Sequence, residues 1–163
     1  MAPRTRRWQA ADRGSGRSLS AAKRFEDGRA MINLDDEVVE EYLTECREHV
    51  AAIEAELLAM EKGGPQIDDE VLNRAIRAVH SVRGGGSLFA LVKVRELAHQ
   101  MEVAMAQICS RLIVPKLNVV CVLLHVNDWL SGLIEDPGTS NEADINEVVG
   151  VLVGLCTDQT SVV

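Results

Sequence analysis

The chain has 163 residues, of which 47% are hydrophobic and only 3% aromatic, and it carries a formal net charge of −8 at pH 7. This length suits a single domain with one core, and so few aromatic side chains favour helices packed on helices over a β-sandwich. No uninterrupted apolar run approaches the ~18 residues that cross a bilayer, and the first thirty residues lack the apolar stretch of a secretory signal, so we expect a cytoplasmic protein with no membrane partner.

Charge is distributed unevenly along the sequence. Residues 1–30 hold eight Lys/Arg and three Asp/Glu, a balance of +5, which leaves nine basic and twenty-two acidic residues, a balance of −13, for the remainder. We expect residues 1–32 to form a basic disordered extension, residues 33–157 to form the folded domain and residues 158–163 to fray. The acidic domain argues against nucleic acid as a partner, because phosphate contacts need clustered Lys and Arg.

The first two predicted helices follow the basic extension. Apolar residues recur at steps of three and four from about 35 to 61, the period of a helix with one apolar side, and the stretch GGP at 63–65 stops it. The second helix begins near Asp68 and Asp69, acidic residues suited to a helix start, and runs into a group of three glycines.

Three further helices are predicted. The third spans about 92–112, and the fourth, about 116–134, is apolar on more than one side, so it should pack against several neighbours. The fifth opens at 139–142 with TSNE, the spacing of a capping box. The apolar stripe of the third helix consists of Val94, Leu97, Met101, Ala104, Met105, Ile108 and Leu112. Short connections favour an all-α fold, an antiparallel four-helix bundle with an additional C-terminal helix.

The cysteines fall within the predicted helices and include no Cys-x-x-Cys pair, so we expect reduced thiols rather than disulfides or metal ligands. They are Cys46, Cys109, Cys121 and Cys156.

A histidine followed by three glycines stands near the end of the second helix, in the stretch RAVHSVRGGGS at 77–87. His80 lies about 100° round the helix from the apolar stripe, so its imidazole should be accessible to solvent. Each glycine costs about 1 kcal/mol relative to alanine in a helix interior, so three of them need a reason. We expect Gly84 and Ser87 to leave room for a partner beside His80, and Gly86 to allow a tight helix crossing.

The stretch AVHSVRGGGSLF at 78–89 resembles the histidine phosphotransfer (HPt) motif, in which a histidine is followed by a hydrophobic residue, Lys or Arg, Gly, small residues and an aromatic or aliphatic residue. On the next helix, LAHQME at 97–102 is similar to the second signature of the HPt domains that open chemotaxis-type histidine kinases. The resemblance covers about 35–156. It departs from the family pattern at Arg83, where Lys is more usual, and at Ala90, where Gly is frequent, which leaves the end of the second helix open.

The resemblance implies a phosphotransfer protein of a two-component phosphorelay, a phosphocarrier without a kinase domain of its own. His80 would accept a phosphoryl group from a histidine kinase or a receiver's aspartyl phosphate and pass it to a response-regulator receiver domain. Glu102 would hydrogen-bond one ring nitrogen and orient the imidazole, Arg83 would offset the phosphoryl charge, and His99 would help to hold the carboxylate. We expect a monomer without a cofactor. Any Mg²⁺ would come from the partner, because no cluster of aspartates is present.

Two alternatives remain open, and a third is disfavoured. The chain could be a detached phosphoacceptor domain of a chemotaxis-type histidine kinase, in which case a kinase function would belong to the whole protein. It could also be a helical docking protein that binds receivers without being phosphorylated. A di-metal bundle would need paired Glu-x-x-His motifs, but only His99-x-x-Glu102, in reverse order, is present, so no metal is expected.

Overall fold

The computed structural model describes residues 37–64 and 66–158, which lie in the second of the chain's two units, Asn33–Val163. Within these ranges the elements are all helical: α3 (Glu37–Gly63), α4 (Asp69–Leu88), α5 (Val92–Cys109), α6 (Leu117–Glu135), the 3-10 helix η1 (Ser140–Glu142) and α7 (Asn146–Asp158). The predictions for residues 1–32 and 159–163 lie outside the described residues, and Asp158, the first residue predicted to fray, is the last residue of α7.

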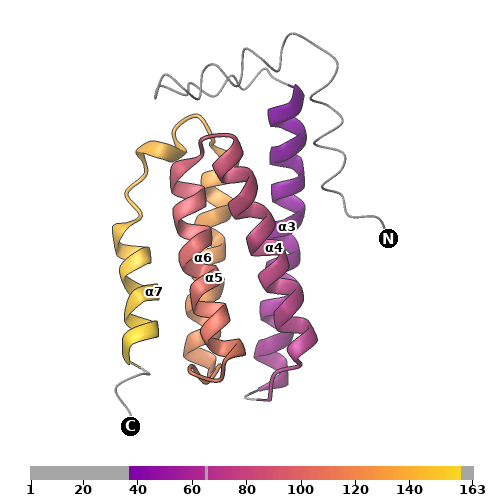
Figure 1. Cartoon of the computed structure of the whole chain (residues 1–163), viewed down its shortest axis with the longest axis vertical. Helices are drawn as coiled ribbons and strands as arrows, with labels where there is room; N and C mark the ends of the chain where they lie inside the picture. The colour runs from indigo at the N-terminus through magenta and orange to yellow at the C-terminus, as the bar shows by residue number, and fades with distance from the viewer. Residues whose placement is uncertain (1–36, 65, 159–163) are drawn as a thin grey trace. The chain divides into compact units, whose positions relative to one another are not determined.

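Four of the helices form a closed ring. α3 packs against α4 and α6, and α5 packs against the same two helices, so each has two neighbours around one core (Figure 1). α7 lies outside this ring, on the side formed by α5 and α6 (Figure 1). The arrangement confirms the predicted all-α bundle with an additional C-terminal helix.

The core is made of the apolar stripes that the sequence predicts. In α5 the stripe is fully buried from Val94 to Ile108, and α3 and α4 contribute their own stripes. Leu112, predicted as the last member of the α5 stripe, is instead 58% exposed. The helix ends at Cys109, and Arg111 then takes a left-handed conformation (φ 59°), so Leu112 no longer follows the helical period.

α6 is the most apolar of the longer helices. Its 19 residues have the length and mean hydropathy, 1.5 over an 18-residue window, of a helix that could cross a membrane. Its position in the bundle accounts for that composition, because it contacts α3, α5 and α7 and therefore buries more than one of its sides. Asn127 is buried on this helix and donates from Nδ2 to the carbonyl of Val50 on α3, at 3.1 Å.

All four cysteines are free thiols in helices. Cys46 is buried in α3, and burial raises the pKa of its thiol to about 11. Burial also raises the pKa of the Cys156 thiol. Both groups are therefore protonated and poorly nucleophilic at neutral pH.

α4 begins and ends with distinct capping arrangements. At its start, Asp68 Oδ1 accepts the N–H of Glu70 at 2.9 Å, as the acidic residues at this point predict. The helix then runs through all three glycines to Leu88. Beyond it, Ala90 takes a left-handed conformation (φ 55°) and the N–H of Leu91 donates back to the carbonyl of Gly86 at 2.9 Å. This is a Schellman-type ending with alanine where glycine is favoured.

The capping box predicted at 139–142 is wrong. α7 begins at Asn146, whose N–H donates to Asp144 Oδ1 at 3.0 Å, while the predicted cap residue Thr139 donates its hydroxyl to Asp136 Oδ2 at 2.8 Å. The segment forms η1 instead, and Asn141 within it hydrogen-bonds the start of a different helix.

Asn141 caps the turn between α4 and α5. Its Oδ1 accepts the N–H of Val92, in the first turn of α5, at 2.7 Å, and its Nδ2 donates to the carbonyl of Ala90 at 2.9 Å. Leu91, the residue before α5, has no side chain that caps the helix. The turn therefore depends on an amide supplied from far along the chain.

The left-handed Ala90 predicts that Ala90→Gly stabilises the fold. A non-glycine residue in this region costs about 1–3 kcal/mol, so glycine should raise the free energy of unfolding by about 1 kcal/mol after its own entropic cost is subtracted. Urea unfolding followed by circular dichroism measures the change. Ala51→Gly, at an exposed position inside α3, is the matched control and should lower the same quantity by about 1 kcal/mol. Two variants that change stability in the same direction would contradict the assignment.

Candidate functional site

His80 projects from the middle of α4 into solvent, with 62% of its side chain exposed. One ring nitrogen is engaged: Nδ1 lies 3.0 Å from Glu102 Oε1, on α5. Among the described residues, Nε2 has no hydrogen-bond partner. The ring is therefore held by one edge, and its other nitrogen is accessible from outside.

The Glu102 carboxylate determines which nitrogen of His80 carries the proton. A carboxylate only accepts hydrogen bonds, so Nδ1 must donate and the lone pair of the neutral ring lies on Nε2. Glu102 itself is only 20% exposed. Its second oxygen, Oε2, lies 2.9 Å from Arg83 Nη1, an ion pair in which Oε2 accepts no well-aligned hydrogen bond. The carboxylate is thus shared between an imidazole and a guanidinium.

His99 contacts the guanidinium rather than the carboxylate. Its Nδ1 lies 3.1 Å from Arg83 Nη1, so any support that it gives to Glu102 passes through Arg83, and its expected supporting role stays a prediction. Because arginine only donates, His99 Nδ1 must be the acceptor and its proton lies on Nε2. The structure therefore brings the four residues singled out in the sequence into one row, His80 and Arg83 on α4 and His99 and Glu102 on α5, with Arg83 between two partners.

The three glycines of α4 meet three different surroundings. At Gly84, one turn beyond His80, an added Cβ would have no heavy atom within 4 Å, so the surface beside the imidazole is open. At Gly86 a Cβ would lie 3.1 Å from the backbone nitrogen of Arg95, so α4 rests directly on the backbone of α5. At Gly85 a Cβ would overlap the ring of Tyr42 on α3. Ser87 is exposed two turns beyond His80 and donates to the carbonyl of Arg83 at 3.2 Å.

Tyr42 is the residue of this region that the sequence did not reveal. Its ring lies over Gly85 and stacks on Phe89, with centroids 4.7 Å apart and planes inclined by 25°. Its hydroxyl donates to the carbonyl of Val82 at 3.1 Å, and burial raises its pKa. One signal was present, because Tyr42 is the single tyrosine of a chain with two phenylalanines, and Phe89 ends the glycine-rich motif.

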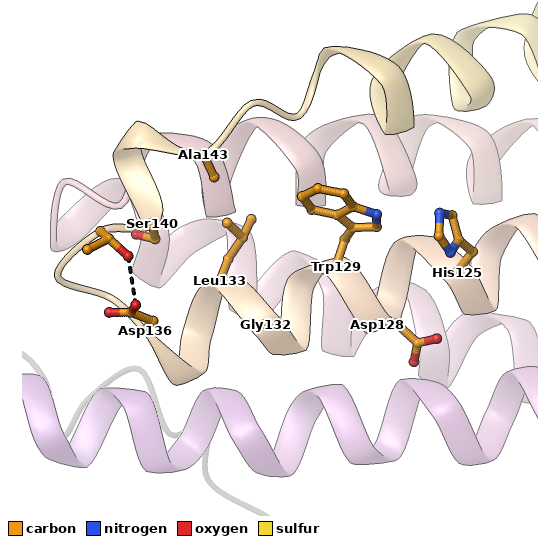
Figure 2. Close-up of a pocket in the computed structure, with 9 residues that line it drawn as sticks. His125, Asp128, Trp129, Gly132, Leu133, Asp136, Ser140 and Ala143 are labelled. Atoms are coloured by element: carbon orange, nitrogen blue, oxygen red, sulfur yellow. Dashed lines mark hydrogen bonds between the residues drawn. The ribbon is translucent and has the colours of Figure 1, made fainter.

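A separate groove of about 550 Å³ lies on α6 and the connection to η1. Figure 2 shows Trp129 and Leu133 turned to the side of Ala143, while Asp128 points away from them. None of the four residues of the His80 row lines the groove. In the part of the chain that the structure describes, no group of three or more His, Cys, Asp and Glu side chains is placed to hold a metal ion.

The chain is similar to known proteins over much of its helical domain. Residues 37–131 match a family model described as the Hpt domain. The chain is 31% identical over 127 residues to "Chemotaxis protein CheA" of Rhizobium meliloti (strain 1021), which covers 76% of this chain and 16% of that protein. It is 32% identical over 75 residues to "Chemotaxis protein CheA" of Cereibacter sphaeroides, which covers 46% of this chain and 11% of that protein. The chain therefore spans a small part of these relatives.

The surroundings of the glycines predict opposite effects of alanine at adjacent positions. Gly85→Ala should lower the free energy of unfolding by about 1–3 kcal/mol, because its methyl group displaces the Tyr42 ring. Gly84→Ala should raise it by up to about 1 kcal/mol, because the methyl group meets only solvent and alanine favours the helix. Urea unfolding of the two variants provides the comparison. Equal changes in stability would show that Tyr42 does not rest on Gly85.

Proposed function

The chain belongs to the Hpt domain family, the histidine phosphotransfer domains of two-component phosphorelays, and on this premise we propose that His80 is the residue that receives and passes on the phosphoryl group. An Hpt domain is a phosphocarrier rather than a kinase, and its partners are receiver domains and histidine kinases. The observation that carries the proposal is the exposed imidazole whose Nδ1 is held 3.0 Å from the Glu102 carboxylate.

The transfer step follows from the tautomer of His80. The lone pair of Nε2 attacks the phosphorus atom of the donor, and a P–N bond forms while the P–O bond to the leaving group breaks. The leaving group, a receiver's aspartate or ADP, departs with the electrons of that bond. The proton stays on Nδ1, so the phosphorylated ring is cationic and Glu102 offsets its charge at 3.0 Å. Onward transfer to a receiver aspartate runs the same step in reverse.

Arg83 and the partner supply the remaining electrostatics. Arg83 lies one turn from His80, and its guanidinium is already desolvated in part by Glu102 and His99. When a phosphoryl group is bound to His80, the fixed positive charge of Arg83, one helical turn away, offsets the negative charge on the phosphoryl oxygens. Mg²⁺ needed for the transfer would be held by carboxylates of the partner.

The chain could equally be the phosphoacceptor domain of a longer chemotaxis-type kinase. Both relatives carry that kind of name, and the chain spans only 16% and 11% of their lengths. His80 would then be the substrate of a kinase domain in the same protein, with unchanged chemistry. In either setting we propose a cytoplasmic, monomeric module without nucleic-acid or membrane partners.

His80→Gln is expected to abolish phosphorylation by a histidine kinase or a phosphorylated receiver domain. The amide has no ring nitrogen to attack phosphorus, so no acid-labile, base-stable phosphate should form on the variant. His125→Gln, which removes an exposed histidine in the α6 groove, is the control and should be labelled like the wild type. A His80→Gln protein that is still labelled would place the phosphoryl group on another residue and contradict the proposal, whereas one that supports signalling without phosphate would favour the docking protein.

Glu102→Ala should slow phosphorylation of His80 by roughly tenfold or more, because a hydrogen bond to a charged group is worth about 1.5–3 kcal/mol and each 1.4 kcal/mol is a factor of ten. Glu102→Gln keeps an acceptor without its charge and should lose less. Two-dimensional ¹H–¹⁵N NMR of the imidazole gives a second readout, since the proton should leave Nδ1 for Nε2 in the alanine variant. An unchanged tautomer and rate would remove Glu102 from the proposed site.

A further inference from the structure

We propose that Arg77 and Arg95 steer an acidic partner surface, the carboxylate-lined phosphoacceptor site of a receiver domain, onto His80. The two residues belong to the same face of α4 and α5 as the imidazole, and neither has been given a role by the chemistry above. The inference rests on the proposed function of His80, and it adds to it the charge of the partner and the residues that select that charge.

The first observation in support is that Arg77 and Arg95 form no ion pair among the described residues. Five of the nine Lys and Arg residues in the described ranges form ion pairs: Arg47 with Glu135, Arg74 with Glu56, Arg83 with Glu102, Lys93 with Glu96, and Arg111 with Asp69. The other four, Lys62, Arg77, Arg95 and Lys116, have no ion-pair partner among the described residues. Two of these four cations lie on the helices that carry the His80 row.

The second observation in support is the position of these two arginines on α4 and α5. Arg77 precedes His80 by three residues on α4, and Arg95 precedes His99 by four residues on α5, so each shares a helix face with a member of the row. Both residues are exposed. Because α5 runs antiparallel to α4, and its Arg95 backbone meets Gly86, Arg95 lies beyond Arg83 as seen from His80. Together, Arg77, His80, Arg83 and Arg95 form what we call the cationic strip.

The strip contrasts with the rest of the domain. Residues 31–163 carry nine basic and twenty-two acidic residues, a balance of −13, so an acidic partner is repelled by the domain as a whole. Within the His80 row the carboxylate of Glu102 is matched by the guanidinium of Arg83 at 2.9 Å, and Glu96 on the same helix is matched by Lys93 at 3.5 Å. The unpaired charge that remains along the strip is positive, which favours approach of an acidic surface to this face.

The chemistry of phosphoryl transfer specifies the sign of the charge on the partner's reacting surface. A receiver accepts phosphate on an aspartate and needs carboxylate oxygens to hold Mg²⁺ beside it, so its reacting site is acidic. Opposite charges on two surfaces raise association rates by about tenfold or more, with little effect on the later chemical step. Arg77 and Arg95 should therefore raise the rate of association with the partner, while His80 carries out the transfer of the phosphoryl group.

Short-range contacts are available once the surfaces meet. Leu88 on α4 and Val103 on α5 are 52% and 37% exposed, and they follow Gly84 and His99 respectively by one helical turn on the same face. Gly84, at which an added Cβ would have no heavy atom within 4 Å, lies between Leu88 and the imidazole on α4. An apolar contact bordered by cations resembles the anatomy of a transient protein interface.

The test compares phosphoryl transfer from the phosphorylated chain to a receiver domain from the same genome, chosen as the one that dephosphorylates the wild type fastest. The strip variant is Arg77→Gln with Arg95→Gln. The control variant, Lys62→Gln with Lys116→Gln, removes the same charge from the last turn of α3 and the residue before α6. Transfer is measured at several salt concentrations, and urea unfolding checks that both variants are folded. Labelling of the wild type by phosphoramidate, a small donor that needs no docking, tests His80 by itself.

We expect kcat/KM for transfer to fall about tenfold in the strip variant at low salt, through KM with kcat unchanged, and the dependence on salt to become weaker, while the control variant behaves as the wild type. Equal losses in both variants would reduce the effect to net charge and overturn the inference, as would a loss in kcat alone or no loss at all. Failure of phosphoramidate to label His80 in the wild type would instead overturn the proposed function.

Discussion

The close approach of α4 and α5 at Gly86 is the constraint on which the His80 site depends. With no side chain at this position, the backbone of α4 rests on that of Arg95, where even a methyl group would press on the nitrogen at 3.1 Å. That separation allows a glutamate on α5 to reach Nδ1 of His80 and an arginine on α4 to reach His99. A wider crossing would leave the same side chains unable to span the gap. The tautomer of the imidazole is thus set by backbone packing one to two turns away.

The glycine run makes sense as three independent requirements met by consecutive residues. Gly84 keeps the outer surface open, Gly85 accepts the Tyr42 ring from α3, and Gly86 allows contact with α5. Because successive helical residues are rotated by about 100°, three in a row necessarily face three directions. The propensity lost by three glycines is offset by burial of an aromatic ring and by packing of a second helix, both of which hold the helix that carries the imidazole.

The sequence predicted the features that depend on local period and missed those that depend on distant contacts. Helical spacing indicated the bundle, and the two matched motifs brought His80, Arg83, His99 and Glu102 to one face, because all four lie on adjacent helices joined by a short turn. It did not indicate that His99 binds the guanidinium, since that choice depends on side-chain conformations. Nor did it indicate Tyr42, 43 positions from Gly85 along the chain. The predicted capping box failed for the same reason. Its spacing suited the start of the last helix, but Asn141 within it hydrogen-bonds the first turn of α5 instead.

The amide of Asn141 carries a consequence for where this module can be cut. The family match stops at residue 131, yet the N–H of Val92 and the carbonyl of Ala90, in the turn that follows α4, are hydrogen-bonded by the side chain of Asn141, ten residues beyond that limit. A fragment that ends at residue 131 would lack Asn141. Both backbone groups would then be exposed to water, and the turn between α4 and α5 would be less firmly held. The autonomous unit is therefore longer than the segment by which it is detected, and chimeras or interchangeable modules built from it should keep the chain through η1 and α7.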